Sequence, residues 1–95
     1  MEAAGREVAG VAQALTPVDR ERLRALGANI RERRTARDLT LEDLANEAGL
    51  SVTYLGQTER GQRNPSVLVL WRVAEALGIS LDQLVAPDPG PRSRR

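Results

Sequence analysis

The residues with the greatest chemical capacity in this chain are its fourteen basic side chains, all of which are arginine. The guanidinium group donates paired hydrogen bonds to phosphate and to guanine, which would suit nucleic-acid binding. A GC-rich coding sequence is the simpler explanation of the arginine bias.

The chain has no cysteine and no histidine, which removes disulfides, thiolate sites and the commonest general base and metal ligand. We therefore expect no catalytic site, no metal and no cofactor.

The acidic residues stand singly beside arginines, as on solvated helix faces, and do not form the pairs that carboxylate catalysis needs. Residues 19–86 contain ten acidic residues and ten arginines, whereas residues 87–95 add a net charge of +2. A neutral domain still binds phosphate if its positive charges cluster on one face. The charge distribution therefore permits a nucleic-acid interface, and we expect that the chain is not an enzyme.

Cap residues and glycines divide the chain into predicted helices. Thr16 and Thr40 each precede an acidic residue three positions on, which is typical of helix N-termini. Gly49, Gly61 and Gly78 follow apolar stretches and are typical of helix ends. No run of alternating β-branched residues indicates a strand. We therefore predict an all-α fold of five helices, at about 17–36, 41–48, 52–60, 65–77 and 81–85.

The second and third predicted helices are joined by so short a turn that residues 41–60 are typical of a helix-turn-helix unit. Ala45 is small where the next helix crosses close to it, and Gly49 permits a positive φ in the turn. Leu55 anchors the third helix to the core. The opposite face of the third helix is then free to enter a groove.

Further motifs follow in the order Glu59-Arg60-Gly61, Arg63-Asn64-Pro65-Ser66 and Ala74-Glu75-Ala76-Leu77-Gly78. With the helix-turn-helix pattern, they make residues 23–85 resemble the lambda-repressor-like (Xre) family. Residues 54–56 and 59–64 are similar in particular to controller proteins of restriction-modification systems. The resemblance implies a five-helix DNA-binding domain at residues 17–86 and a transcriptional regulator.

In this family the N-terminal part of the third helix reads base edges in the major groove, which the resemblance transfers to Val52, Thr53 and Gln57. Gln57 would bind adenine through its amide, and Val52 and Thr53 would contact a thymine methyl. The alternatives are that Val52 packs against helix 41–48 and that Gln57 is exposed without a role.

The resemblance implies phosphate contacts after this helix, at Arg60, Arg63 and Asn64, where a solvated loop is the alternative. Tyr54 would place its hydroxyl on a phosphate or lay its ring over helix 41–48. Leu41 stands where the family often has glutamine for a phosphate contact. Without that amide, the contact falls to the backbone N–H groups at the start of helix 41–48, with Thr40 as a hydroxyl donor.

Arg34 and Glu59 match a family ion pair that ties the first helix to the end of the third. We therefore expect Arg34 to be structural and not to contact DNA. If the pair is buried, removing one partner leaves an uncompensated charge.

Helix 65–77 carries more apolar residues than one core face requires. Its predicted inward stripe is Val67, Leu70, Ala74 and Leu77. The remaining apolar side chains predict a homodimer interface, because so apolar a patch is uncommon on a monomer and tryptophan is a frequent hot-spot residue. That interface comprises Leu68, Val69 and Trp71, with Ile79 and Leu81 at its edge.

Residues 1–16 form a predicted N-terminal arm with a weak helical stripe, and the alternative to a dimer is that Val8, Val11 and Leu15 of this arm cover the apolar surplus. Residues 87–95 hold three prolines and three arginines, so we expect a disordered basic tail.

No apolar run approaches the roughly 18 residues of a membrane span, and the N-terminus lacks a signal-peptide pattern. We expect a cytoplasmic protein without a membrane or small-molecule partner.

Two functions fit these features. The first is a homodimeric regulator whose recognition helices, at residues 52–60, read a palindromic operator in double-stranded DNA about 34 Å apart. The alternative is an antitoxin-like module that binds a toxin or another protein partner, with DNA secondary. Leu41, the neutral domain and the spare apolar face favour the alternative, and the salt dependence of DNA binding separates the two.

Overall fold

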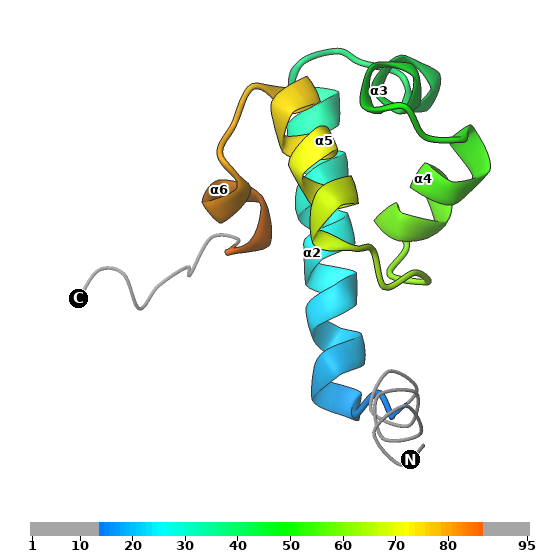
Figure 1. Ribbon diagram of the computed structural model, residues 1–95, viewed down its shortest axis with the longest axis vertical. Coiled ribbons are helices and arrows are strands. Elements are labelled where there is room, and N and C mark those ends of the chain that lie inside the picture. Colours follow the sequence, from blue (N-terminus) through cyan, green and yellow to red (C-terminus); the bar gives the residue numbers. More distant parts are fainter. Residues whose placement is uncertain (1–13, 87–95) are drawn as a thin grey trace, which may run out of the picture.

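The computed structural model describes residues 14–86, which form five helices and contain no strand. These are α2 (Pro17–Ala36), α3 (Leu41–Ala48), α4 (Val52–Glu59), α5 (Val67–Leu77) and α6 (Leu81–Val85) (Figure 1). The predicted all-α fold with a short turn between the second and third helices is confirmed. Most of the predicted arm at residues 1–16 and all of the predicted tail at residues 87–95 lie outside the described residues.

Side-chain caps determine where the helices begin. The hydroxyl oxygens of Thr16 and Thr40 accept hydrogen bonds from the backbone N–H groups of Asp19 and Asp43, at 3.0 and 2.9 Å. Each aspartate accepts in return from the backbone N–H of its cap residue, which holds the pKa of both carboxyls below its usual value. Gly49 then ends α3 with a φ of 71°, in the left-handed region that favours glycine.

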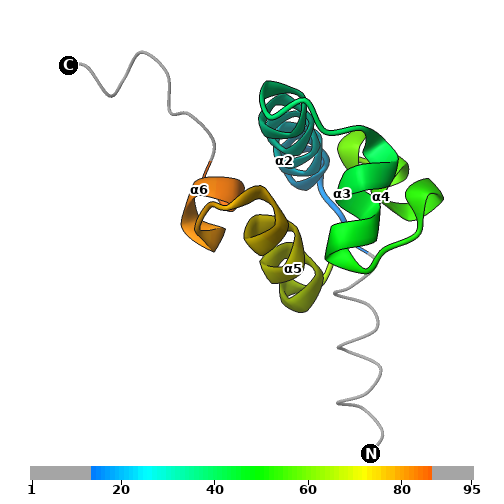
Figure 2. The same cartoon turned by 90° about the horizontal axis from the view of Figure 1, so that it is seen from above.

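The helices contact one another in a closed ring, in the order α2, α4, α3, α5 and α6, with α6 returning to α2. Viewed along α2, the pair α5 and α6 lies to one side of it and the pair α3 and α4 to the other (Figure 2). Each helix contributes a fully buried side chain to the shared core, namely Ile30, Leu44, Leu55, Val73 and Leu84. The side chain of Asn29 fastens α6 to α2, because it donates to the carbonyl oxygens of Gln83 and Leu84 at 3.1 and 2.8 Å.

The start of α5 differs from its prediction. Its N-cap is Ser66, whose hydroxyl accepts from the backbone N–H of Val69 at 3.2 Å, and Pro65 is buried in front of the helix. The inward placement of Val67 was wrong, because this residue is 56% exposed in a first turn that extends past the core. The stripe that α5 buries is Leu70, Val73, Ala74 and Leu77.

Candidate nucleic-acid interface

The position of α4 is set by its close contact with α2. At Gly27 the two helices meet without an intervening side chain: a Cβ atom there would lie 2.3 Å from the carbonyl oxygen of Glu59 and 2.4 Å from that of Thr58. Leu55 and Thr58 are buried on the same side of α4, and the Thr58 hydroxyl donates to the carbonyl oxygen of Tyr54 at 2.9 Å. The opposite face of α4 is therefore turned to solvent.

A second link between α2 and α4 is an ion pair that neutralises one arginine. Arg34 Nε donates to Glu59 Oε2 at 2.7 Å and Arg34 Nη2 donates to Glu59 Oε1 at 3.1 Å, a paired geometry. A third donor, Nη1, reaches the carbonyl oxygen of Leu39 at 2.8 Å. The two side chains are 12% and 7% exposed, and the hydrogen bonds that Arg34 donates to Glu59 raise the pKa of Arg34. Arg34 is thus occupied within the fold.

The exposed face of α4 begins at its first turn. Ser51 caps the helix, since its hydroxyl accepts from the backbone N–H of Tyr54 at 3.0 Å. Thr53 is exposed, Val52 is 40% exposed and Gln57 is half-buried one turn further on. The residues predicted to read bases therefore lie on one short helix that is open to solvent, and α3 does not enclose Val52.

Arg63 follows α4 and lies over its outer face. Its Nε donates to Gln57 Oε1 at 2.8 Å, and its guanidinium carbon is 5.1 Å from the centroid of the Tyr54 ring, within the range of a cation–π contact. The loop is held beneath it, because the backbone N–H of Gln62 donates to the carbonyl oxygen of Gln57 at 2.9 Å. The structure thus brings together three residues that the sequence analysis assigned separately, and the Tyr54 ring faces Arg63.

A hollow of about 260 Å³ opens where α2, α3 and α4 meet. It is lined by Arg31, Arg34, Leu41, Gly56, Glu59 and Arg60. The side chain of Leu41 packs against Gly56, where an added Cβ would lie 3.3 Å from Leu41 Cδ2, and as an apolar group it offers a ligand no hydrogen bond. Among the described residues, Arg31 and Arg60 form no ion pair.

Arg31 did not emerge from the sequence analysis. It stands ten positions before Leu41 in the chain, and no local pattern marks it. Asn64, by contrast, was predicted beside Arg60 and Arg63 but lines a separate hollow with Asp19 and Arg22 at the start of α2. The structure therefore adds one arginine to the hollow between the helices and does not bring Asn64 into it.

Comparisons with known proteins agree with this geometry. The model of the helix-turn-helix family HTH_3 matches residues 30–84. The chain belongs to this family. One relative of this HTH_3 chain is y4dJ of Sinorhizobium fredii, described as an uncharacterized HTH-type transcriptional regulator, which is 42% identical over 62 residues, or 65% of this chain and 80% of that protein. Another is the control protein C.SmaI of Serratia marcescens, 38% identical over 60 residues, or 63% of this chain and 71% of that protein.

Solved structures of the same family include the restriction-modification controller protein C.AhdI of Aeromonas hydrophila. The similarity has a TM-score of 0.65 at 44% identity and covers 65% of the HTH_3 chain and 94% of C.AhdI. The clp gene regulator ClgR of Corynebacterium glutamicum has a TM-score of 0.66 at 35% identity, covering 68% and 69% of the two chains. The predicted resemblance to lambda-repressor-like regulators is confirmed, and the family is one of DNA-binding transcriptional regulators.

The HTH_3 chain also carries an exposed apolar face on α5. Three large apolar side chains leave more than half of their surface in solvent, namely Val67 (56%), Leu68 (55%) and Trp71 (53%). Three other residues of the predicted homodimer interface pack partly against the core, namely Val69, Ile79 and Leu81. The exposed apolar face is therefore centred on the first half of α5.

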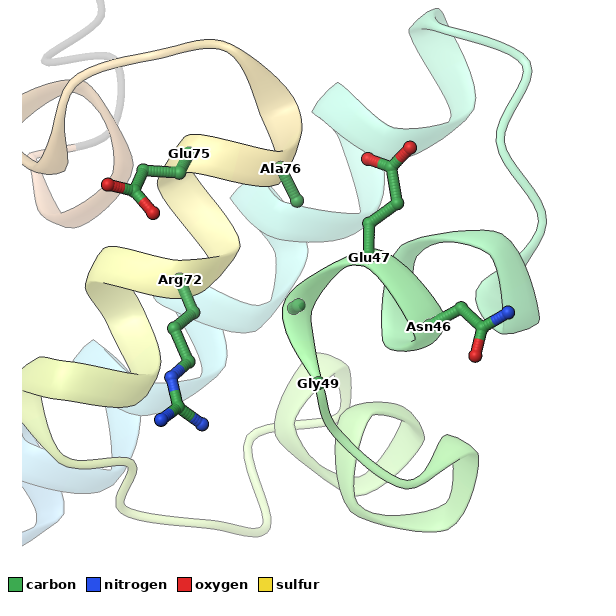
Figure 3. Close-up of a pocket in the computed structure, with 7 residues that line it drawn as sticks. Asn46, Glu47, Gly49, Arg72, Glu75 and Ala76 are labelled. Carbon is green, nitrogen blue, oxygen red and sulfur yellow. The ribbon is translucent and has the colours of Figure 1, made fainter.

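A larger hollow, of about 530 Å³, lies between α3 and α5 of the HTH_3 chain (Figure 3). Arg72 extends toward the turn at Gly49, whereas the carboxylates of Glu47 and Glu75 point away from each other (Figure 3). Its charged groups do not converge on a common ligand. No group of acidic side chains that could hold a metal ion occurs among residues 14–86, and no helix there is long and apolar enough to cross a membrane.

Proposed function

We propose that this protein binds double-stranded DNA sequence-specifically as a homodimer and regulates transcription, with α4 in the major groove. The observation that carries the proposal is the solvent-facing α4, fixed to α2 at Gly27 and by the Arg34–Glu59 pair, with the side chains of its first turn exposed. A rigid recognition helix of this kind is how helix-turn-helix domains read base edges. Val52 and Thr53 on its first turn are the residues that contact bases.

The phosphate contacts of this proposal surround the hollow between α2, α3 and α4. The N-terminus of α3 directs backbone N–H groups outward at Leu41, and helix N-termini favour anions. Thr40 accepts the Asp43 N–H but retains its hydroxyl hydrogen for donation. Arg31 and Arg60 add two positive charges beside them. Asn64, which lies at a separate hollow beside the start of α2, would contact a phosphate away from this group. The single charge of Arg34 is neutralised by Glu59 and takes no part.

The test of this function is a binding selection on random duplex DNA at moderate salt, with the bound pool sequenced. The expected result is a two-fold palindrome with half-sites about one helical turn apart. A folded protein that enriches no sequence would contradict the proposal. It would favour the alternative, a module that binds a protein partner through the apolar face of α5.

Trp71→Arg is expected to give a folded monomer that has lost most of its affinity for the palindrome. Trp71 is 53% exposed, so the fold tolerates arginine there, whereas a charge at the centre of a two-fold apolar interface is repeated on both subunits. Light scattering measures the mass, and titration of labelled duplex measures the affinity. Val18→Arg is the matched control, because Val18 is 57% exposed on the first turn of α2. A Trp71→Arg protein that remains dimeric would refute this interface.

Arg60→Ala is expected to weaken binding to all DNA sequences by a similar factor. If Arg60 contacts one phosphate, the slope of log affinity against log salt falls by about one unit, because one fewer counterion is released. Arg33→Ala is the control, since Arg33 contacts Asn29 on the side of α2 that faces α6. A loss confined to the selected sequence would instead make Arg60 a base-reading residue.

A further inference from the structure

We propose that Arg63 reads a guanine base and that Gln57 and Tyr54 are the positioning residues that hold its guanidinium group. The inference rests on the proposed DNA-binding function and changes two assignments made from the sequence, where Arg63 was placed on a phosphate and Gln57 on an adenine. It starts from two contacts of one side chain: the 2.8 Å hydrogen bond from Arg63 Nε to Gln57 Oε1 and the 5.1 Å approach to the Tyr54 ring.

These contacts orient Arg63 and leave free the two terminal nitrogens of its guanidinium group, Nη1 and Nη2, which form a planar fork of donors. An arginine has five N–H donors in a rigid plane, and the bond to Gln57 uses the one on Nε. Among the described residues, Nη1 and Nη2 of Arg63 make no hydrogen bond or ion pair. Two parallel donors of this kind match O6 and N7 of guanine in the major groove, which is the commonest specific contact between proteins and DNA.

The partners of Arg63 preserve its charge. Gln57 is neutral and does not offset the charge of Arg63, whereas the carboxylate of Glu59 neutralises Arg34 on the other side of α4. A phosphate contact needs a positive charge but no fixed plane. A paired contact with a base edge gains from a side chain that is already ordered, because less rotamer entropy is lost on binding. Holding Arg63 in one orientation, as Gln57 and Tyr54 do, therefore favours base reading and adds little to a phosphate contact.

The same hydrogen bond limits what Gln57 does. Reading adenine requires both the oxygen and the nitrogen of the amide to face the base. Here Gln57 Oε1 accepts from Arg63, and its carbonyl direction is set by that bond. Gln57 therefore acts on base preference through Arg63. The guanidinium carbon lies over the Tyr54 ring, so Tyr54 supports Arg63 with its ring and not with its hydroxyl.

The test uses the full chain and the sequence recovered by the binding selection. Arg63→Lys keeps the charge and removes the fork. We expect this variant to lose about tenfold or more of the preference for guanine at one position of each half-site, with an unchanged salt slope. In the matching duplex, 7-deazaguanine at that position removes N7. It should weaken wild-type binding by a similar factor and weaken binding of Arg63→Lys less, because lysine also donates to guanine but without a fixed pair of donors.

Two controls make the outcome decisive. Arg60→Lys should preserve every base preference, since a charge suffices there. Gln57→Ala should lower the same guanine preference, and this effect should disappear in the Arg63→Lys background, because the two residues act as one unit.

Three results would overturn the inference: a guanine preference that Arg63→Lys leaves undiminished, a wild-type protein indifferent to 7-deazaguanine at every selected guanine, or a Gln57→Ala effect that persists at another base when Arg63 is lysine. Failure to select any sequence with the wild-type protein would overturn the proposed function itself.

Discussion

Glu59→Gln is expected to lower the free energy of unfolding by about 3–5 kcal/mol, because it leaves the Arg34 guanidinium charged and largely buried without its counterion. The two side chains are 12% and 7% exposed, and their paired bonds of 2.7 and 3.1 Å leave little room for water to replace the carboxylate. Glutamine keeps the size of the side chain and one accepting oxygen, so the substitution isolates the charge. Urea denaturation followed by circular dichroism measures the loss.

Two controls separate the effect of the unpaired charge from a general sensitivity of α4 to substitution. Arg34→Met with Glu59→Leu removes both charges at once and should recover much of the loss, since apolar replacement of a buried ion pair is often close to neutral. Arg22→Ala breaks a solvated pair with Asp19, where the side chains are 74% and 36% exposed, and should change stability far less than Glu59→Gln does. Equal losses from Glu59→Gln and Arg22→Ala would show that the Arg34–Glu59 pair is solvated.

The helix boundaries were predictable because their causes are local. A threonine cap and the aspartate three residues later exchange two hydrogen bonds within one turn, so Thr16 and Thr40 mark helix starts without reference to the rest of the fold. Gly49 likewise ends α3 through its own backbone conformation. The start of α5 was harder, because Pro65 is also typical of a first helical position. The serine after it forms the cap instead.

Side-chain exposure followed from periodicity except at the ends of helices. Val67 has the spacing of a core residue relative to Leu70 and Ala74, but spacing does not tell how far the core extends along α5. Its first turn projects beyond the core, so Val67 joins Leu68 and Trp71 on the exposed face. The extent of a core is a tertiary property, which a pattern within one helix does not contain.

The candidate site was predictable only as far as the family motif reaches. Arg34 and Glu59 are 25 positions apart and were paired through the resemblance, whereas nothing in the pattern joins Arg31 to Arg60 or Arg63 to Gln57. Both of these juxtapositions depend on where the α4–α5 loop and the second half of α2 come to lie. The sequence shows how many arginines the chain has. It does not show which of them are neutralised by a carboxylate in the folded protein.

The contact of Gly27 with α4 likewise could not be predicted from a local pattern. Replacing Gly27 with alanine is the second substitution for which we expect a large effect. An alanine Cβ would lie 2.3 Å from the carbonyl oxygen of Glu59 and 2.6 Å from its carbonyl carbon. These are backbone atoms, so α4 must move as a whole. Overpacking of this kind destabilises by about 1–3 kcal/mol or more, although alanine within a helix is otherwise favoured over glycine by about 1 kcal/mol.

Gly56→Ala is the matched control for Gly27→Ala. Its Cβ would meet the ends of two flexible side chains, at 3.3 Å from Leu41 Cδ2 and 3.5 Å from Arg60 Nη1, which can shift by a few tenths of an ångström. The same substitution is therefore expected to have opposite signs at two positions: a loss of stability at Gly27 and a gain approaching 1 kcal/mol at Gly56. Thermal and urea unfolding of both variants measure this difference. A stabilised Gly27→Ala protein would mean that α2 and α4 lie further apart in solution, and α4 would then lack the rigid support on which the proposed base reading depends.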